Sequence, residues 1–515
     1  MPAPRPSPES SPAAASHTLA EILEGKKAKL RHLRSEGVDP YPARCRRTHS
    51  LAQALEVASP LKAGDHAGAV VEAVGRIVAL RDMGGSAFAH LEDGSARCQA
   101  YFKKDAMPAE AFDLLKKSVD LGDFVAVAGT VFRTKTGEPT IAVSGISILS
   151  KSLRPLPEKW HGLKDVETRY RLRHLDLVSN RDVRSDFEKR SLIVKTVRST
   201  LDSAGFLEVE TPILLPQAGG ASARPFSTHH HALKRDMVLR IATELYLKRL
   251  IVGGFEKVYE IGRIFRNEGI DTKHNPEFTM LEAYQAYADY NGMADLFERV
   301  VGNCAQALGV SQVTENGRTV DLRPPFPRVR LPELWRKLLG EPIDAVLDGL
   351  RFNAPALQRL AGRLGLGAVE GVPNAKIFER IVDAKILPEI DRETKPVLLF
   401  DHPAAITPLA KLMPGSSAIV ERFEAFAFSQ ELANAYSELN DPLDQRDRFA
   451  EQARRRREER EEEAELLDED FVEALECGMP PTGGIGIGID RLVMLLTGRA
   501  SIRDVILFPI MKDAA

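Results

Sequence analysis

The chain has 515 residues, of which 43% are hydrophobic and 28% are charged, and its net charge is −3. This length and composition predict a globular protein of about three domains. The balanced charge argues against indiscriminate coating of nucleic acid, although it does not exclude a local basic surface. No segment approaches the roughly 20 apolar residues that a membrane span needs, so we expect no membrane partner.

The cysteines are few and scattered, at Cys45, Cys98, Cys304 and Cys477. Their spacing supports neither a disulfide framework nor a cysteine zinc site, and such usage is typical of a reducing compartment. We therefore expect a cytoplasmic protein.

The N-terminal segment divides into two parts. Residues 1–17 are rich in Pro, Ala and Ser and lack the apolar core of a signal peptide, so we expect a disordered tail. Residues 18–66 are a predicted helical segment, because apolar residues recur with helical spacing from Thr18 to Leu33. Between Lys26 and Arg47 there are eight Lys or Arg residues and two acids, which fits a solvated helix face or an RNA-facing patch.

Residues 67–152 are predicted to be a small β-module. Alternating apolar residues indicate five strands and one helix between the third and fourth strands, at 70–80, 87–91, 98–102, 109–119 (the helix), 125–131 and 140–149. This order matches an OB-fold barrel, whose open face commonly binds single-stranded nucleic acid. Phe88 could stack on a base and Gln99 could read a base edge, with Arg81 on a neighbouring strand. An ordinary core position is the alternative for Phe88.

A linker is expected at 153–175, followed by an α+β domain at 176–515. The pattern predicts a long helix at 181–204, capped by Ser179 or Asn180. We expect strands of one antiparallel sheet at Met237–Ile241, Lys257–Phe265 and Phe278–Ala288, with further strands at 397–400, 422–428 and 484–489.

Two further segments of this domain stand out. Residues from about 331 to 391 alternate helical patches with Gly and Pro, which predicts a helical insertion. The charged run 454–470 is expected to be an exposed, salt-bridged helix, and we assign no chemistry to it.

The run from Tyr259 to Glu268 is the most informative one. We expect a strand that ends in Arg266, so that Arg266 and Glu268 lie on one face of the sheet. The cation could hold a phosphate, the carboxylate could accept from an exocyclic amine, and Phe278 on the returning strand could stack on a base. A surface ion pair is the alternative.

Glycines recur at every second position in Gly484, Gly486 and Gly488. On a strand this spacing leaves one face bare, so that a flat ligand could lie on the backbone. Arg491 begins the next helix, whose N-terminus attracts anions. The spacing differs from the dinucleotide-binding fingerprint, and a tight packing site is the alternative.

Acidic residues gather in the run from Glu421 to Glu438. Glu424 and Glu431 could bind Mg²⁺ that bridges nucleotide phosphates. Glu438 with Tyr436, and Glu282 with Tyr284, would form an acidic, aromatic-walled pocket for an ammonium group. Solvated surface acids are the alternative.

Other catalytic patterns are weak or missing in the sequence. Adjacent histidines in His229–His231 alternate sides and lack a carboxylate or Cys partner with ligand spacing, so we reject a metal site there. There is no Ser-His-Asp order, GxSxG or P-loop.

Together, these runs resemble a known family. GVDPYP, GGASARPF, LYLKRLIVGGFEKVYEIGRIFRNEG, HNPEFTMLEAYQAYADY, NAYSELNDP and GGIGIGIDR are similar to the motifs of class II aminoacyl-tRNA synthetases, and among these to the bacterial-type lysyl-tRNA synthetases. The resemblance covers about residues 26–509. It implies an anticodon-binding OB-fold barrel, a six-stranded antiparallel catalytic sheet flanked by helices with a helical insertion, and a homodimer. The implied reaction is ATP-dependent activation of L-lysine and its transfer to the 3′ end of tRNA(Lys).

The resemblance also implies roles for the residues that match the family's motifs. For ATP, Arg266 would hold the α-phosphate, Glu268 the adenine amine and Phe278 the ring, and the triphosphate would be approached by His274, Asn275 and Arg491. Mg²⁺, up to three ions per subunit, would be ligated by Glu424 and Glu431. Arg266 and Arg491 would be the catalytic residues.

For lysine, Gly220 and Glu244 would take the α-amino group, and Arg266 and Asn434 would reach the carboxylate. The ε-ammonium would be recognised by Glu282, Tyr284 and Glu438, with Tyr436 along the methylene chain. The anticodon positions implied in the barrel are Arg81, Phe88, Gln99 and Glu138.

Three other functions compete with this one. An aspartyl- or asparaginyl-type synthetase would need cations where this chain has Glu282 and Glu438. The enzyme that transfers lysine to elongation factor P lacks the N-terminal β-module. A non-catalytic RNA-binding paralogue should have lost the motif arginines or the metal-binding carboxylates, which are present here.

Overall fold

The computed structural model describes residues 18–157, 163–458 and 468–512, with only the backbone at 456 and 457. The chain divides into two compact units, residues 1–162 and 163–515. The predicted tail at 1–17 and most of the acidic part of the 454–470 run lie outside the described residues. Among the described helices, none has both the length and the apolar character needed to cross a bilayer.

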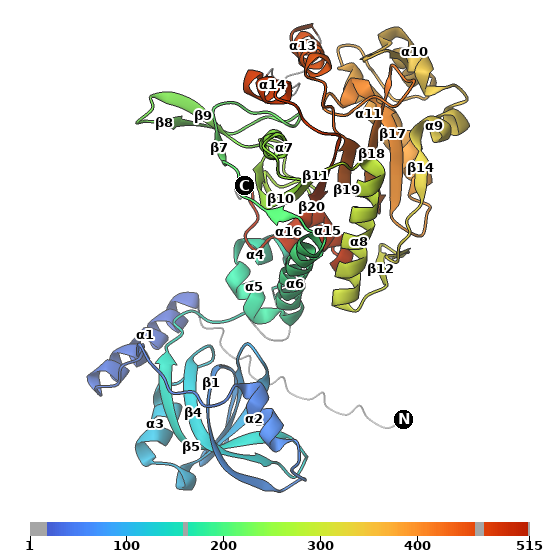
Figure 1. The fold of residues 1–515 in the computed structure, drawn as a ribbon. Coiled ribbons are helices and arrows are strands. Elements are labelled where there is room, and N and C mark those ends of the chain that lie inside the picture. The colour runs from blue at the N-terminus through green and yellow to red at the C-terminus, as the bar shows by residue number, and fades with distance from the viewer. Residues whose placement is uncertain (1–17, 158–162, 459–467, 513–515) are drawn as a thin grey trace, which may run out of the picture. The chain divides into compact units, whose positions relative to one another are not determined.

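The first unit contains a closed five-stranded barrel, drawn in blue and cyan in Figure 1, as the sequence predicted. Its strands pair in the order β1-β2-β3-β5-β4. Alternate residues of β4 are buried, which is the pattern of a strand with one face on the core. The elements are α1 (Leu19–Ser35), α2 (Leu51–Ala58), β1 (His66–Asp82), β2 (Ser86–Glu92), β3 (Arg97–Lys103), α3 (Ala109–Ser118), β4 (Phe124–Arg133) and β5 (Pro139–Ser150).

Part of the basic charge in α1 has a structural use that the sequence did not indicate. Lys26 Nζ donates to the backbone carbonyls of Leu121 (3.0 Å) and Ser152 (3.1 Å), and Lys29 Nζ lies 2.5 Å from Asp120 Oδ1. These two lysines therefore attach α1 to the barrel.

The second unit is built on an eight-stranded sheet. Its strands run in the order β14-β17-β18-β19-β20-β11-β10-β6, and the six central strands pair antiparallel, as the resemblance implied. Short parallel strands extend both edges. The bounds are β6 (Leu207–Glu208), β10 (Lys257–Phe265), β11 (Glu277–Ala286), β14 (Arg328–Arg330), β17 (Val397–Pro403), β18 (Ile419–Ala427), β19 (Gln430–Ser437) and β20 (Thr482–Gly488).

One predicted strand does not belong to this sheet. The prediction for Met237–Ile241 is wrong, because the strand found there, β9 (Arg235–Leu239), pairs with β7 (Leu214–Leu215) and β8 (Ser227–His230) in a separate three-stranded sheet. Both edges of β9 are thus occupied locally. His229 lies on this hairpin, with its Nδ1 2.7 Å from Asp236 Oδ1.

Helices α6 (Arg181–Ser203), α8 (Tyr290–Leu308) and α15 (Ile489–Thr497) pack on one face of the sheet and form the main core of this unit (Figure 1). Asn180 is the N-cap residue of α6, as predicted, but the prediction that its side chain caps the helix is wrong. The Asn180 side chain donates to Asp176 Oδ1 (2.6 Å) and makes no cap hydrogen bond. Short helix α4 (Val166–Arg171) and the start of α5 (Arg173–Ser179) occupy residues expected in the linker at 153–175, and α16 (Ile502–Val505) follows α15.

The predicted helical insertion is present, and its apolar residues form a second core together with residues of β17 and β18. It contains a two-stranded hairpin and a π-helical turn at Val382–Ile386 that the sequence did not indicate. Its elements are α9 (Leu331–Leu339), β15 (Leu347–Asp348), β16 (Arg351–Phe352), α10 (Ala354–Arg363), α11 (Asn374–Ile381) and α12 (Leu387–Ile390), and the hairpin β12 (Gln312–Glu315) and β13 (Arg318–Asp321) precedes it.

The charged run beginning at Arg454 is only partly an exposed helix. Helix α13 (Pro442–Glu458) carries Arg454, which pairs with Glu451 at 2.6 Å and with Glu458, as predicted. Arg455 is instead buried and donates to the carbonyl of Ala405, so exposure is wrong for this residue. A separate helix, α14 (Glu469–Glu476), follows the undescribed residues.

Candidate functional site

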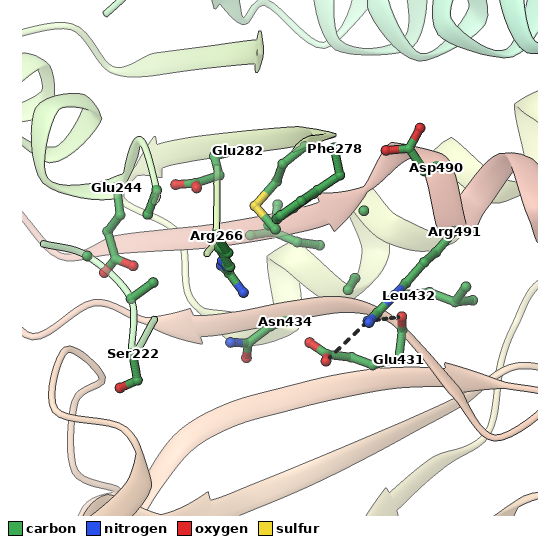
Figure 2. Close-up of a pocket in the computed structure, with 18 of the residues that line it drawn as sticks. Ser222, Glu244, Arg266, Phe278, Glu282, Glu431, Leu432, Asn434, Asp490 and Arg491 are labelled. Carbon is green, nitrogen blue, oxygen red and sulfur yellow. Dashed lines mark hydrogen bonds and ion pairs between the residues drawn. The ribbon is translucent and has the colours of Figure 1, made fainter. Parts of the chain in front are cut away.

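A cavity of about 390 Å³ lies on the face of the sheet opposite the helical core. The alternation along β11 produces this division: Leu281 and Ala283 face the core, whereas Met280, Glu282 and Tyr284 line the cavity. Figure 2 shows Glu244 at one end of the cavity and Arg491 at the other, with Arg266 between them.

The cavity brings together most of the residues selected from the sequence. Two of them, Glu424 and Glu438, lie outside its lining. Those that line it are Gly220, Glu244, Arg266, Glu268, His274, Asn275, Phe278, Glu282, Tyr284, Glu431, Asn434, Tyr436 and Arg491. Residues from separate parts of the chain therefore share one cavity.

The β20 glycines line this cavity, but they do not play equivalent parts. A Cβ on Gly486 would meet nothing closer than 3.8 Å, and on Gly488 nothing closer than 3.6 Å. A Cβ on Gly484 would overlap Glu438 Oε1 and lie 2.5 Å from the Tyr284 ring. The bare face expected from the sequence is thus present at two positions, whereas Gly484 is needed for close packing.

The Glu244 end of the cavity is strongly acidic. We call Glu244, Glu282 and Glu438 the acid cluster, and all three are buried. Lys248, one turn after Glu244 in α7 (Glu244–Val252), places its Nζ 2.6 Å from Glu244 Oε1 and in contact with Glu438 Oε2. Two of the three carboxyl groups therefore pair with one ammonium group of the protein itself.

Glu282 accepts hydrogen bonds at both of its oxygens. The backbone N–H of Thr243 donates to Oε1 (3.1 Å), and the Tyr284 hydroxyl donates to Oε2 (3.2 Å). Burial, and then the negative charge of Glu244, raise the pKa of Glu282 to about 7. A nearby cation would favour the ionised form, so this carboxyl group is poised to respond to a positively charged ligand.

Gly220 and Tyr436 complete this end. Gly220 has φ +81°, and a Cβ there would lie 3.2 Å from Ala242 Cβ and 3.3 Å from Glu244 Cβ, so glycine is required for both conformation and space. The Tyr436 hydroxyl donates to Glu244 Oε2 (2.8 Å). The ring of Tyr436 therefore forms an aromatic wall beside the acid cluster.

The middle of the cavity is cationic, with a geometry that corrects one prediction. Strand β10 ends at Phe265, so Arg266 and Glu268 lie in the following loop and not on one face of a strand. The Arg266 guanidinium lies 5.4 Å from the centre of the Phe278 ring. Glu268, Glu431, Glu282 and Arg491 all act electrostatically on Arg266. A planar ligand and an anion could thus be held next to each other here.

The opposite end contains His274, Asn275 and Arg491. Arg491 donates to the carbonyl of Glu431 (2.9 Å) and to His274 Nε2 (3.3 Å), while His274 Nδ1 faces Asp271 at 2.9 Å. The Asn275 side chain donates to the carbonyl of Glu277 (2.6 Å) and accepts from the N–H of Ile510 (3.3 Å). Asn275 therefore orders the loop, whereas Arg491 and His274 face an anion site.

The two carboxylates proposed for Mg²⁺ lie on neighbouring strands, Glu424 in β18 and Glu431 in β19. Glu424 pairs with Arg422, and Glu431 lies 3.5 Å from Arg491. Burial at the cavity wall, and then the charge of Glu424, raise the pKa of Glu431. Within the described residues no three His, Cys, Asp or Glu side chains gather as a metal site. Two carboxylates, one of them beside Arg491 in the cavity, nevertheless fit Mg²⁺, which commonly binds through one or two carboxylates plus phosphates.

Sequence reasoning missed Lys248 and Arg422. Arg422 is buried and donates to Asn434 Oδ1 (2.9 Å) and Thr407 Oγ1 (2.6 Å), which leaves the Asn434 amide nitrogen as the donor toward a ligand. The spacing Glu244-x-x-x-Lys248 on a helix could have indicated the first pair. No sequence signal indicates the cross-strand contacts of Arg422.

The residues selected in the barrel gather on its outer surface. Arg81 pairs with Phe88 across β1 and β2, and the Phe88 ring lies 4.7 Å from that of Tyr101. Gln99 Nε2 donates to Glu138 Oε2 (2.9 Å), and the hydroxyl of Thr140 donates to Gln99 Oε1 (2.9 Å). The Gln99 amide therefore has a fixed orientation, and the Phe88–Tyr101 pair on β2 and β3 is half-buried.

Comparison with known proteins agrees with this geometry. The family model described as "tRNA synthetases class II (D, K and N)" matches residues 165–512, and the model described as "OB-fold nucleic acid binding domain" matches residues 71–149. The chain belongs to the class II tRNA synthetases. It is an aminoacyl-tRNA ligase, and every residue that lines the cavity lies within the synthetase match.

Several class II synthetases that are similar to this chain share one name. Proteins named lysine–tRNA ligase are 49% identical to this chain in Dehalococcoides mccartyi strain 195, 50% in Moorella thermoacetica and 48% in Pelotomaculum thermopropionicum. Each alignment covers 96% of this chain and 95–98% of the relative.

Proposed function

We propose that this class II synthetase is a lysine–tRNA ligase. In the first step, a carboxylate oxygen of L-lysine attacks the α-phosphorus of ATP, the bond to the bridging oxygen breaks, and lysyl-adenylate and pyrophosphate form. In the second step, the terminal ribose hydroxyl of tRNA(Lys) attacks the activated carbonyl carbon, AMP leaves, and lysyl-tRNA is released.

The acid cluster is the observation that carries the choice of lysine. Two of the three buried carboxyl groups share the ammonium of Lys248, so the ionised cluster holds more negative charge than this lysine offsets. Lysine brings two ammonium groups. An acidic amino acid would need a free cation here, but Lys248 is already paired with Glu244 and Glu438. Buried acids left without a partner also penalise neutral isosteres such as norleucine.

Arg266 and Arg491 are proposed to bind the reacting phosphates. Phosphoryl transfer depends on orientation and on stabilising the charge that develops in the transition state, and it needs no protein nucleophile. Arg266 lies between the acid cluster and the Arg491 end, where it can reach both the lysine carboxylate and the α-phosphate (Figure 2). Phe278 supplies the adenine-stacking ring and Asn434 a donor to the carboxylate.

Mg²⁺ would be held by Glu424 and Glu431, and when bound it would neutralise charge on the triphosphate. The two carboxylates repel each other across adjacent strands, which a cation would relieve. Arg491 and His274 contribute positive charge and a hydrogen-bonding nitrogen at the same end.

Two partners complete the proposal. The outer surface of the barrel, with Arg81, Phe88, Gln99 and Glu138, is proposed to bind the anticodon of tRNA(Lys). A homodimer is proposed through the region of β6, where exposed apolar side chains gather at Leu207, Ile213 and Leu214.

The test is ATP–pyrophosphate exchange with each amino acid, with and without tRNA, followed by aminoacylation of lysine tRNA. We expect exchange with lysine, much less with ornithine, and almost none with norleucine, methionine or aspartate. Exchange driven by aspartate or asparagine would contradict the proposal. Lysine exchange without transfer to tRNA would favour transfer to a protein, and absence of all exchange would favour a non-catalytic paralogue.

A further inference from the structure

Lys248 is a completely buried lysine that the proposed mechanism does not use. It projects from α7 with its Nζ 2.6 Å from Glu244 Oε1 and in contact with Glu438 Oε2, and its side chain is 0% exposed. The rings of Tyr436 and Phe471 lie 5.7 Å and 5.8 Å from the ammonium. The cation is therefore fixed by carboxylates on one side and aromatic faces on the other.

The two carboxylates depend on Lys248 to different extents. Glu244 also accepts a hydrogen bond from the Tyr436 hydroxyl and lines the cavity. Glu438 does not line the cavity, and within the described residues its oxygens have no hydrogen-bond donor besides the Lys248 ammonium, which contacts Oε2. Its Oε1 points at the backbone of Gly484, where the cavity wall has no side chain. A buried carboxylate in this situation is strongly destabilised unless a counter-ion is present.

We propose that Lys248 is a positioning residue for lysine recognition: it is the fixed counter-ion that favours the ionised form of Glu438 and directs its second oxygen toward the amino-acid end of the cavity. The proposal rests on the proposed function, since it concerns recognition of the same substrate. Lys248 itself does not contact the substrate, and it acts through Glu438.

The charged groups around the Lys248–Glu438 pair determine how the loss of Lys248 would affect the protonation of Glu438. Burial raises the pKa of Glu438 well above its usual value, Glu244 and Glu282 also raise it, and Lys248 is the neighbouring group that lowers it. Tyr284 and Tyr436 are the other titratable groups that face the pair, and their pKa values are raised well above the usual range, so both remain neutral. Without Lys248, Glu438 would take up a proton and lose its attraction for an ammonium group.

The experiment measures lysine and ATP KM by pyrophosphate exchange from pH 6 to 9. In Lys248→Met we expect the lysine KM at pH 7 to rise about tenfold or more, since loss of an adjacent opposite charge shifts a carboxyl pKa by about one to three units. The loss should shrink as the pH rises, because alkaline pH restores the Glu438 carboxylate. The ATP KM should change less than about twofold, because Lys248 does not line the cavity.

Two controls separate charge from shape. Lys248→Arg keeps the cation and should retain the wild-type pH profile, even if its lysine KM is higher. Lys257→Met removes a half-buried lysine that donates to the Ala204 carbonyl (3.0 Å) and does not line the cavity, and it should leave the lysine KM unchanged. A Lys248→Met loss that is constant across pH, absent, or matched by the same rise in ATP KM would overturn the proposal.

If Lys248→Met does not fold, Glu438→Gln is compared with the double variant Lys248→Met/Glu438→Gln. With residue 438 already neutral, removal of Lys248 should change the lysine KM by less than about threefold, because Glu244 retains the Tyr436 hydroxyl. A further tenfold loss would overturn the proposal. A wild-type protein that does not exchange with lysine contradicts the proposed function, whereas normal lysine kinetics in Lys248→Met contradicts only this inference.

Discussion

Each unit of the chain buries one lysine between two carboxylates, and the two clusters are satisfied differently. In the barrel unit, Lys151 Nζ lies 2.5 Å from Asp120 Oδ2 and 2.8 Å from Asp123 Oδ2, with the lysine side chain 0% exposed. Asp123 also accepts from the backbone N–H groups of Ser152 and Asp120, each at 2.7 Å. Lys248 is equally buried, but its partner Glu438 has no such backbone donors among the described residues.

This difference indicates that the Lys151 cluster stabilises the fold, whereas the Lys248 pair is available to interact with a ligand. The Asp120–Lys151–Asp123 cluster uses its charges and hydrogen bonds internally, so little is left for another molecule. The acid cluster has more carboxyl groups than cations and adjoins a cavity, which costs stability until a cationic ligand binds. If this excess of negative charge in the second unit serves to bind the substrate, changes to the residues around it should alter lysine kinetics more than stability.

The largest expected effect comes from Arg266→Ala. Arg266 is the cation between the acid cluster and Arg491, and its Nε donates a long hydrogen bond to the Ile241 carbonyl (3.4 Å). If its charge serves the ligand, lysine-dependent pyrophosphate exchange should fall by about 10²- to 10³-fold or more, while the melting temperature stays close to that of the wild type. Unchanged exchange would refute its role, and a large loss of stability would place Arg266 with the structural pairs.

How far the sequence predicted the fold depended on how local each signal was. Alternation predicted all five barrel strands, and helical spacing predicted α6, because each pattern lies within one continuous segment. The sheet to which β9 belongs could not be predicted in this way, because β9 pairs with β7 and β8, and the pattern within one segment does not identify its partner strands. The same holds for Arg455, which looks like part of an exposed charged run but is buried against the Ala405 carbonyl.

The next effect in size concerns the β20 glycines. A methyl group at Gly484 would overlap Glu438 Oε1 and the Tyr284 ring, whereas one at Gly486 meets nothing within 3.8 Å. Gly484→Ala should therefore cost about 1–3 kcal/mol of unfolding free energy and raise the lysine KM by at least about tenfold. The matched variant Gly486→Ala should keep wild-type stability, as measured by denaturant unfolding. Equal stability losses in both variants would show that the amino-acid end is not packed as described.

A smaller effect should appear in the pH dependence of lysine binding. Because the pKa of Glu282 is raised to about 7, its protonated form dominates at lower pH and attracts an ammonium group weakly. The lysine KM should rise up to about tenfold for each pH unit below 7 and level off above it, while the ATP KM stays flat. In Glu282→Gln the lysine KM should be high at every pH. A wild-type profile that is flat from pH 5.5 to 8.5 would contradict the role of Glu282.

The raised pKa of Glu282 also affects the stability of the ligand-free protein, with the opposite dependence on pH. The folded-state pKa of Glu282 is about 7 against a usual value of 4.5, so its ionisation opposes folding. Its contribution to the free energy of unfolding should therefore fall as the pH rises from about 4.5 to 7. Added lysine should reverse this loss, because it binds the folded, ionised form.

Part of the candidate site could be predicted from the sequence, and part of it could not. Arg266, Glu282 and the β20 glycines stand in compact runs whose residue types already indicate an anion, an ammonium group and a flat ligand. Lys248 and Arg422 act across elements that are distant in sequence, so their partners emerge only when α7, β18 and β19 come together. The sequence also could not show that Glu438 lies behind the cavity wall while Glu244 lines the cavity.

The smallest expected effect tests the barrel surface. Gln99 is oriented by Glu138 on one side and by the Thr140 hydroxyl on the other, so its amide presents a defined edge. Glu138→Gln removes the charge that selects this orientation and should raise the tRNA KM in aminoacylation by about two- to tenfold, the effect of one net hydrogen bond. Asp113→Asn, an exposed acid of α3 paired with Lys117, is the matched control. Lysine-dependent pyrophosphate exchange without tRNA should be unchanged in both variants. Equal tRNA kinetics in the two variants would mean that the fixed Gln99 amide, like the Lys151 pair, serves the barrel and not a ligand.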